Sequence, residues 1–220
     1  MAIEPRISAL CMLHYACAGS EKLIGKFKPA EWNTYQSLLQ STHLHTCSVG
    51  RIFDAVASLL GICDKQSYEG EAALYLQGMA ERWIDENGYD LDDDYFPEDS
   101  DDYRTPVVSL VNGIIADLEK GKPVNYIAAK FHYSLVRLVG IVARNMNIEI
   151  ICFSGGVFQN SLLTDWLEKE YSSSYQLNFH KYLSPNDENI SFGQMVYVDN
   201  NIITPGKSVV ENYSSVLIHQ

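Results

Sequence analysis

A glycine turn after an apolar run is the part of this sequence best suited to bind an anion. The run Ile148–Phe153 is followed directly by Ser154, Gly155 and Gly156. Glycine has no Cβ, so the backbone can turn sharply there, and N–H groups at the start of a following helix can approach a phosphate closely. A tight turn between a strand and a helix, with no ligand, would use the same residues. The pattern leaves these two interpretations equally open.

Two aspartates lie where a fold can place ligand-binding groups. Asp187 stands between a predicted strand and a predicted helix, the position at which open α/β sheets bind ligands. Aspartate at such a position more commonly caps the helix or closes the turn. Asp54 lies inside a predicted helix, and the sequence favours an exposed carboxylate there over a functional one.

The remaining polar candidates give weaker signals. Gly70 and Glu71 lie in a turn that reaches a ligand only if the fold brings it back over the site. His132 lies on a predicted helix and is interpreted as a hydrogen-bonded structural residue rather than a ligand or base. His43 and His45 could chelate a metal, but no third ligand is near them in the sequence, so they are assigned to a surface loop.

The spacing of apolar residues predicts a helix-rich chain with at least two strands. Ile148–Phe153, rich in β-branched residues, is predicted to be a buried strand of a mainly parallel sheet, and Leu177–Tyr182 is predicted to be another strand. Helices are predicted over 5–18, from Pro29 onward, and over 47–62, 72–83, 107–118, 124–146, 160–171 and 190–198. The tail 199–220 has no clear period.

An acidic stretch separates two groups of predicted helices. Between Asp85 and Asp102 the chain carries ten acidic residues and no Lys or Arg. We expect this stretch to be a solvated, mobile connection. A calcium loop is disfavoured because no DxDxDG arrangement with glycine at its sixth position occurs there.

Composition excludes several functional classes. A chain of 220 residues with 46% apolar and 20% charged residues is typical of a soluble globular protein, and its net charge of −12 argues against nucleic acid as a direct partner. No apolar run approaches the roughly 20 residues that span a membrane, and the first residues do not resemble a secretory signal. The five cysteines are scattered and never spaced as CxxC, which favours reduced, mostly buried thiols in a cytoplasmic protein.

Five motifs, taken together and in order, resemble the C-terminal part of the HypF family, the carbamoyltransferases of [NiFe]-hydrogenase maturation. They are GRIFDAVASLLGI at 50–62, SYEGEAAL at 67–74, DLEKGKP with AAKFH within 117–132, FSGGVFQNSLL at 153–163 and SPNDENISFGQ at 184–194. The resemblance implies an α/β fold, the actin-like ATPase (ASKHA, RNase H-like) lobe with added helices. Residues 1–220 would form the C-terminal lobe of a Kae/TsaD-like domain, with an acidic connection at 85–104 and an unassigned tail at 199–220.

The resemblance places a nucleotide at the glycine turn. In the family the SGGVFQN turn lies against the nucleotide, which implies that Ser154, Gly155, Gly156 and Asn160 contact ATP or carbamoyl-adenylate. His132 matches a family position that has no obvious chemical role. No catalytic residue is assigned from these motifs.

The resemblance also implies sites outside the glycine turn. Asp54 matches an acid that holds the ribose, and Gly70 with Glu71 matches a neighbouring turn that contacts the nucleotide. Asp187 falls on an aspartate that ligates a divalent metal ion, iron or zinc. We expect Asp187 and the glycine turn to lie close together, as half of a cleft whose other wall belongs to polypeptide outside this chain.

Several parts of the family pattern are missing from this sequence. No histidine pair has the HxxxH spacing of the family's metal-binding histidines, and the first lobe's aspartate-glycine turn, the CxxC zinc fingers, the acylphosphatase-like domain and the YrdC-like domain are absent. One aspartate does not hold a catalytic metal, because such sites usually supply about three protein ligands. The metal would therefore be shared with residues absent from this chain.

These implications together predict a carbamoyltransferase fragment. The complete enzyme would transfer a carbamoyl group from carbamoyl-adenylate to the C-terminal cysteine of a HypE-type acceptor protein, with upstream HypF domains as further partners. This chain alone is expected to be inactive. Two alternatives stay open at this point: a non-catalytic nucleotide-binding scaffold, and an O-carbamoyl or threonylcarbamoyl transferase of the same superfamily.

Overall fold

The computed structural model describes residues 3–41, 45–91, 93–96 and 107–203, except for the side chains of 199–203. The chain divides into two compact units, which are described separately. The first unit consists of Met1–Cys152 and Asn160–Asn178, and the second unit consists of Phe153–Gln159 and Phe179–Gln220. His43, from the predicted surface loop, lies outside the described residues.

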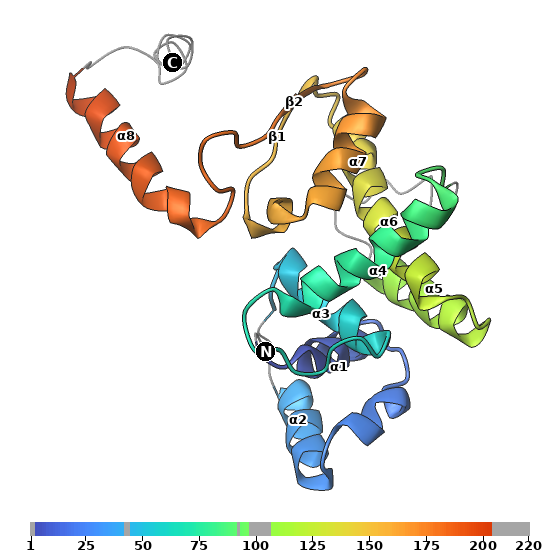
Figure 1. Ribbon diagram of the computed structural model, residues 1–220. Helices are drawn as coiled ribbons and strands as arrows, with labels where there is room; N and C mark the ends of the chain where they lie inside the picture. The colour runs from blue at the N-terminus through green and yellow to red at the C-terminus, as the bar shows by residue number, and fades with distance from the viewer. Residues whose placement is uncertain (1–2, 42–44, 92, 97–106, 204–220) are drawn as a thin grey trace. The chain divides into compact units, whose positions relative to one another are not determined.

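The first unit is built mainly from helices, and the predicted helices are confirmed to within a few residues at their ends (Figure 1). The α-helices are α1 (Pro5–Tyr15), α2 (Pro29–Ser41), α3 (Val49–Leu59), α4 (Glu71–Asn87), α5 (Val107–Glu119), α6 (Val124–Asn145) and α7 (Ser161–Tyr171), and a 3₁₀-helix, η1 (Glu21–Lys26), precedes α2. Glycines at positive φ follow three of them, Gly61 after α3, Gly88 after α4 and Gly121 after α5. Glycine adopts this conformation without steric cost, so it ends a helix cleanly.

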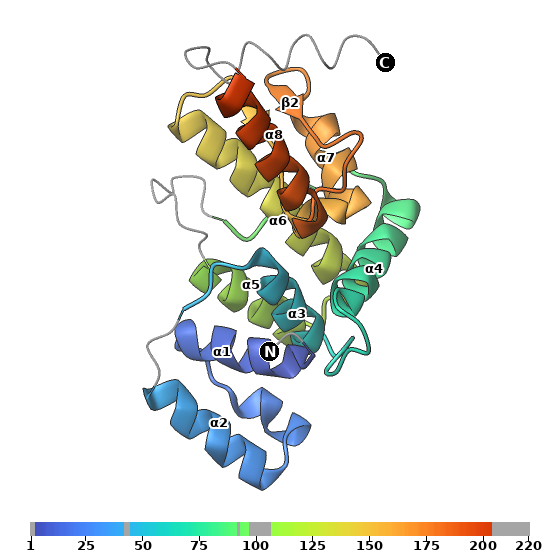
Figure 2. The same cartoon turned by 90° about the vertical axis from the view of Figure 1, so that its left-hand side faces the viewer.

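Helix α6 is the central element of the first unit (Figure 2). It packs against α4, α5 and α7, while α1 packs against α3 and α5. The Phe131 ring of α6 meets the Phe53 ring of α3 edge to face, with 4.9 Å between centroids, and Trp166 of α7 is fully buried. Burying each such aromatic side chain contributes about 2–3 kcal/mol. By length and composition α6 could cross a membrane, but 61% of its apolar window is buried inside the protein, as in the core helix of a globular fold.

The sheet is smaller and more exposed than the sequence predicts. Strand β1 (Ile150–Cys152) pairs in parallel with β2 (Gln176–Asn178). The parallel pairing confirms the prediction, but the expectation of a buried strand is wrong, because Ile150 is 56% exposed. Among the described residues, β1 and β2 are the strands that form the sheet. A parallel sheet normally has both faces covered by other elements. Apolar residues of this run, such as Ile150, therefore lie on a surface that the described residues do not cover.

The second unit contains the glycine turn and the chain after β2. Its elements are the 3₁₀-helices η2 (Gly156–Gln159) and η3 (Asp187–Asn189) and the helix α8 (Ile190–Ile203). The Phe153 ring stacks on the Phe179 ring with 4.5 Å between centroids and an interplanar angle of 11°. This stacked pair is one of the places where the two segments of the second unit meet.

The start of the acidic stretch keeps most of its described acids exposed, as expected, but it is packed onto the protein through the buried side chains of Leu91, Tyr95 and Phe96, which corrects the expectation of a mobile connection for the part that is described. Residues 85–87 belong to α4. Further on, the Asp93 carboxylate lies 2.6 Å from Lys130 Nζ, and the Tyr95 hydroxyl donates to Asp117 Oδ2 at 2.9 Å. Lys130 on α6 thus pairs with Asp93, an acid that has no Lys or Arg near it in the sequence. Residues 97–106 of this stretch lie outside the described residues.

The cysteines also differ from the prediction. All five carry free thiols, but only Cys63 is buried, whereas Cys17, Cys47 and Cys152 are exposed and Cys11 is half-buried. The expectation of mostly buried thiols is therefore wrong. Their positions at helix ends and on the uncovered sheet account for their exposure.

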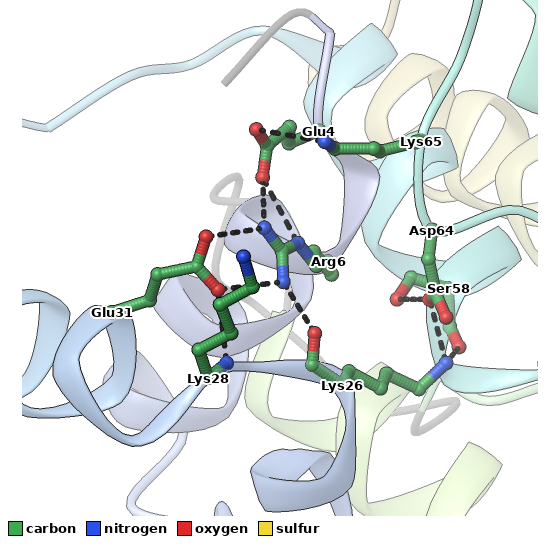
Figure 3. A network of polar contacts seen from close by, with 8 residues as sticks. All are labelled: Glu4, Arg6, Lys26, Lys28, Glu31, Ser58, Asp64 and Lys65. Atoms are coloured by element: carbon green, nitrogen blue, oxygen red, sulfur yellow. Dashed lines mark hydrogen bonds and ion pairs between the residues drawn. The ribbon is translucent and has the colours of Figure 1, made fainter.

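A polar network ties the N-terminal helices to the loop between α3 and α4 (Figure 3). The buried Arg6 guanidinium donates to Glu4 Oε2 at 2.9 Å from Nε and to the backbone carbonyl of Lys26, and it pairs with Glu31 at 3.4 Å. The Lys26 ammonium in turn donates to Asp64 Oδ1 at 2.6 Å and to the Ser58 carbonyl at 2.7 Å. Two cations therefore connect α1, the start of α2 and the α3–α4 loop.

Because Arg6 is buried, its loss should destabilise the protein more than the loss of an exposed cation such as Lys22. Arg6→Met keeps the apolar stem but leaves the Glu4 carboxylate and the Lys26 carbonyl without their donor, so we expect the free energy of unfolding to fall by about 2 kcal/mol. Lys22→Met is the control, because the Lys22–Glu119 pair is exposed at both ends and should cost less than about 0.5 kcal/mol. Urea denaturation of both variants measures the difference, and equal losses would contradict the assigned role of Arg6.

Candidate functional site

The glycine turn has the sharp backbone conformation that the sequence predicts. Gly155 has φ +104°, a value that strains any residue with a side chain. Its N–H donates to the Pro185 carbonyl at 2.7 Å, and its own carbonyl accepts from the Phe158 N–H at 3.0 Å. The chain then enters η2 directly. Glycine is required at position 155 by the fold itself.

The glycine turn and the turn that carries Asp187 lie against each other, as expected. Besides the Gly155–Pro185 bond, Gln159 Nε2 donates to Ser184 Oγ at 3.2 Å. The two segments are 25 residues apart in the sequence, so only the fold of the second unit brings them together.

Asp187 does not cap η3, because its neighbour Asn186 does. Asn186 is the N-cap of η3, and its side-chain oxygen accepts from the Glu188 N–H at 3.0 Å. The commoner interpretation of Asp187 as the cap is therefore wrong. The Asp187 side chain is exposed, next to the glycine turn.

His180 is a polar residue of this site that the sequence analysis missed. Its Nδ1 faces Asn189 Nδ2 at 3.4 Å, and its Nε2 lies 3.1 Å from Ser154 Oγ. Asn189 is oriented as a donor, because the same amide nitrogen donates to the Ser184 carbonyl at 2.7 Å. A neutral His180 thus carries its proton on Nε2 and donates to Ser154. Its place at the end of a predicted strand, just before the Ser184 turn, was the available signal.

Asp54 is buried, which corrects the expectation of an exposed helix carboxylate. It is 2% exposed, lies 2.6 Å from Arg51 Nη1 and accepts a hydrogen bond from the Gln66 side chain. Burial raises the pKa of Asp54, and the Arg51 charge and the Gln66 hydrogen bond oppose that rise. Within the first unit, the Asp54 carboxylate is thus bound by the side chains of Arg51 and Gln66.

Gly70 and Glu71 form the start of α4. Gly70 is the N-cap and has φ +88°, so this position also favours glycine. The Glu71 carboxylate turns back to accept from Ser67 Oγ at 3.0 Å and from the Tyr75 hydroxyl at 3.0 Å. The hydrogen bond from the Ser67 backbone N–H is the main reason that the pKa of Glu71 is lowered. The turn is thus closed by its own carboxylate, which stays exposed.

Asn160 and His132 form a hydrogen-bonded pair inside the first unit. Asn160 is the N-cap of α7, and its Oδ1 accepts from the Leu163 N–H at 3.0 Å. Its Nδ2 lies 3.1 Å from His132 Nε2, and His132 Nδ1 lies 2.8 Å from the Ala128 carbonyl. The interpretation of His132 as a hydrogen-bonded structural residue is confirmed.

The predicted site residues are divided between the two units. Ser154, Gly155, Gly156 and Asp187 belong to the second unit, whereas Asp54, Gly70, Glu71 and Asn160 belong to the first. Within the described parts of the chain, no three His, Cys, Asp or Glu side chains are grouped closely enough to hold a metal ion.

Comparison with known proteins identifies relatives over most of the chain. Residues 1–194 match the family model "Carbamoyltransferase, Kae1-like Domain, second subdomain". Carbamoyltransferase HypF of Synechocystis sp. is 31% identical over 153 residues, which make up 69% of this chain and 19% of that protein. Carbamoyltransferase HypF of Rhodobacter capsulatus is 29% identical over 206 residues, 87% of this chain and 25% of that protein. The chain thus spans about a fifth to a quarter of these relatives.

Solved structures show the same fold. A crystal structure of full-length HypF in the phosphate- and nucleotide-bound form matches 94% of this chain and 28% of its own, with a TM-score of 0.76 and 25% identity. HypF of T. kodakarensis matches 77% of this chain and 22% of its own, with a TM-score of 0.63 and 25% identity. These similarities confirm the predicted fold class, an α/β lobe of the actin-like ATPase type with added helices.

The buried histidine predicts a pH dependence of stability. Burial lowers the pKa of His132 from 6.5 to about 4. Below pH 6.5 the unfolded histidine binds a proton that the folded one does not, so the stability that the neutral ring contributes is full above this pH and is lost as the pH falls toward 4. The shift corresponds to about 3 kcal/mol.

His132→Gln removes this titration and leaves the other titratable groups in place. The difference in unfolding free energy between wild type and His132→Gln, measured by urea denaturation, should therefore shift in favour of the variant as the pH is lowered from about 7 to about 4.5. A difference that stays constant over this range would mean that His132 titrates normally in the folded protein.

Proposed function

Since the chain belongs to the HypF-type carbamoyltransferase family, as the second subdomain of its Kae1-like domain, we propose that it is the nucleotide-binding C-terminal lobe of such an enzyme. The complete enzyme transfers the carbamoyl group of carbamoyl-adenylate to the C-terminal cysteine of a HypE-type acceptor during hydrogenase maturation. The upstream domains of the enzyme supply the opposite wall of the site.

The meeting of the two turns in the second unit is the observation that best supports this proposal. The hydrogen bond from the Gly155 N–H to the Pro185 carbonyl holds the Gly155–Gly156 pair against the turn that carries the exposed Asp187. Nucleotide phosphates need close backbone approach, and a divalent metal needs oxygen or nitrogen ligands. This arrangement offers both within one small unit.

Each residue has a limited role in the proposed reaction. Gly155 and Gly156 let the adenylate approach the backbone, and Ser154 offers a hydroxyl that His180 orients. Asp187 would be one ligand of a divalent iron or zinc ion, which when bound polarises a carbonyl or phosphoryl oxygen. The acceptor thiolate attacks the carbamoyl carbon, and the bond from that carbon to the adenylate oxygen breaks to release AMP.

The proposal also accounts for what one lobe can do alone. A metal site needs about three protein ligands, and Asp187 is one. The isolated chain would therefore bind adenine nucleotide weakly and turn over little or no substrate. It would act in the cytoplasm on a protein partner and not on a membrane, and its net charge of −12 disfavours direct contact with nucleic acid.

Gly156→Ala tests nucleotide binding at the turn. A Cβ at this position would meet Gln159 and Asn186 only at 3.8 and 3.9 Å, which is ordinary contact distance, so we expect the melting temperature to stay within about 2 °C of wild type. A ligand that approaches the backbone would be blocked, and AMP affinity measured by calorimetry should fall by about tenfold or more.

Gly193→Ala is the matched control in the same unit, since a Cβ there meets nothing within 4 Å. This variant should bind AMP as the wild type does. Equal AMP affinity of both variants and wild type would show that the nucleotide does not bind at the glycine turn.

Asp187→Ala tests the metal assignment in the complete enzyme. Loss of a ligand should reduce both zinc or iron content and AMP release from ATP and carbamoyl phosphate, the latter on the order of 100-fold. Glu188→Ala is the control, because this neighbouring acid in η3 is also exposed and should leave both unchanged. Full metal content in Asp187→Ala would contradict the assignment.

A further inference from the structure

His132 is a polar side chain placed deep in an aromatic part of the core. It is fully buried on α6. The rings of Phe53 and Phe131 meet its imidazole edge to face, with centroids 5.3 and 5.5 Å away. An unpaired ring nitrogen in such surroundings would cost about 1–3 kcal/mol, so both nitrogens need a partner.

The two partners determine which nitrogen carries the proton. The Ala128 carbonyl, 2.8 Å from Nδ1, can only accept, so Nδ1 of a neutral ring must be protonated. Nε2 is then an acceptor, and the group that faces it at 3.1 Å is Asn160 Nδ2. The imidazole therefore receives a hydrogen bond from the Asn160 amide.

This tautomer orients the Asn160 side chain completely. Oδ1 accepts from the Leu163 N–H at 3.0 Å, and one Nδ2 hydrogen is donated to His132. The second Nδ2 hydrogen has no acceptor among the residues that the structure describes. Asn160 is 9% exposed, and it directly follows the segment 153–159 that carries the glycine turn.

Capping alone does not explain an asparagine at this position. Serine and aspartate cap helices about as well as asparagine does, and neither requires a histidine behind it. Asparagine adds an N–H donor to the cap. His132 adds an acceptor, which prevents the side-chain amide of Asn160 from flipping by 180°. The pair preserves one oriented donor at the start of α7.

We propose that His132 is a positioning residue for Asn160, which it orients so that the remaining Nδ2 hydrogen is donated to an acceptor atom of the bound adenine nucleotide. This rests on the proposed function. In this arrangement the remaining Nδ2 hydrogen of Asn160 needs an acceptor atom on the ligand. Groups it can serve are a phosphoryl oxygen, a ribose hydroxyl oxygen or an unprotonated ring nitrogen of adenine.

Three variants of the full 220-residue chain test the proposal. His132→Leu removes the acceptor behind Asn160, whereas His132→Gln keeps an acceptor oxygen where Nε2 lies. Asn160→Ser keeps a neutral capping oxygen and removes the amide donor. AMP is the probe, with affinity measured by calorimetry, and hydrogen exchange of the Leu163 amide together with thermal denaturation reports whether α7 and the fold are intact.

We expect His132→Leu and Asn160→Ser to weaken AMP binding by about tenfold, the value of one oriented hydrogen bond, while Leu163 stays protected in both. His132→Gln should restore affinity to within about threefold of wild type. A purely structural role would instead lower Leu163 protection and melting temperature in step with affinity. Unchanged AMP affinity in His132→Leu overturns this inference alone, whereas no AMP binding by the wild-type chain overturns the proposed function and this inference with it.

Discussion

The burial of α6 is the constraint on which much of the first unit depends. A helix packed on several sides must satisfy each of its polar groups inside the protein, because an unpaired buried group costs about 1–3 kcal/mol. Lys130 meets this need with the carboxylates of Asp93 and Asp117, at 2.6 and 3.2 Å. Ser134 accepts from the Tyr95 N–H at 3.0 Å. The start of the acidic stretch is therefore held in place by the polar requirements of the core helix.

His132, which lies between Lys130 and Ser134 on α6, must meet the same requirement. Its need for a donor at Nε2 is met by Asn160, which also begins α7. One buried ring thus links the core of the first unit to the residue at which the chain leaves the glycine turn. Asn160 thus caps α7 and is also the residue that we propose donates to the nucleotide. Mutations of Asn160 can therefore separate an effect on stability from an effect on nucleotide binding.

The exposed sheet and the small second unit fit a lobe that belongs to a larger assembly. Two parallel strands of three residues each are marginal by themselves, and Ile150 on β1 and Phe192 and Met195 on α8 are exposed. The chain covers 28% of a full-length relative of the same fold. In the proposed enzyme, upstream polypeptide would supply both the missing metal ligands and the cover for these apolar surfaces.

The sequence by itself determined the helices, the parallel strand pair, the glycine at position 155 and the family, because each depends on local spacing, on backbone conformation or on short motifs read in order. Tertiary structure decided the rest. Asp54 is buried and accepts a hydrogen bond from Gln66, which lies beyond the end of its helix, and Asp93 is paired because Lys130 reaches it from 37 residues away. Which nitrogen of His132 is protonated follows from groups on two helices. Periodicity reports which face of an element is apolar, but the partner of a buried polar group depends on long-range contacts that only the folded chain creates.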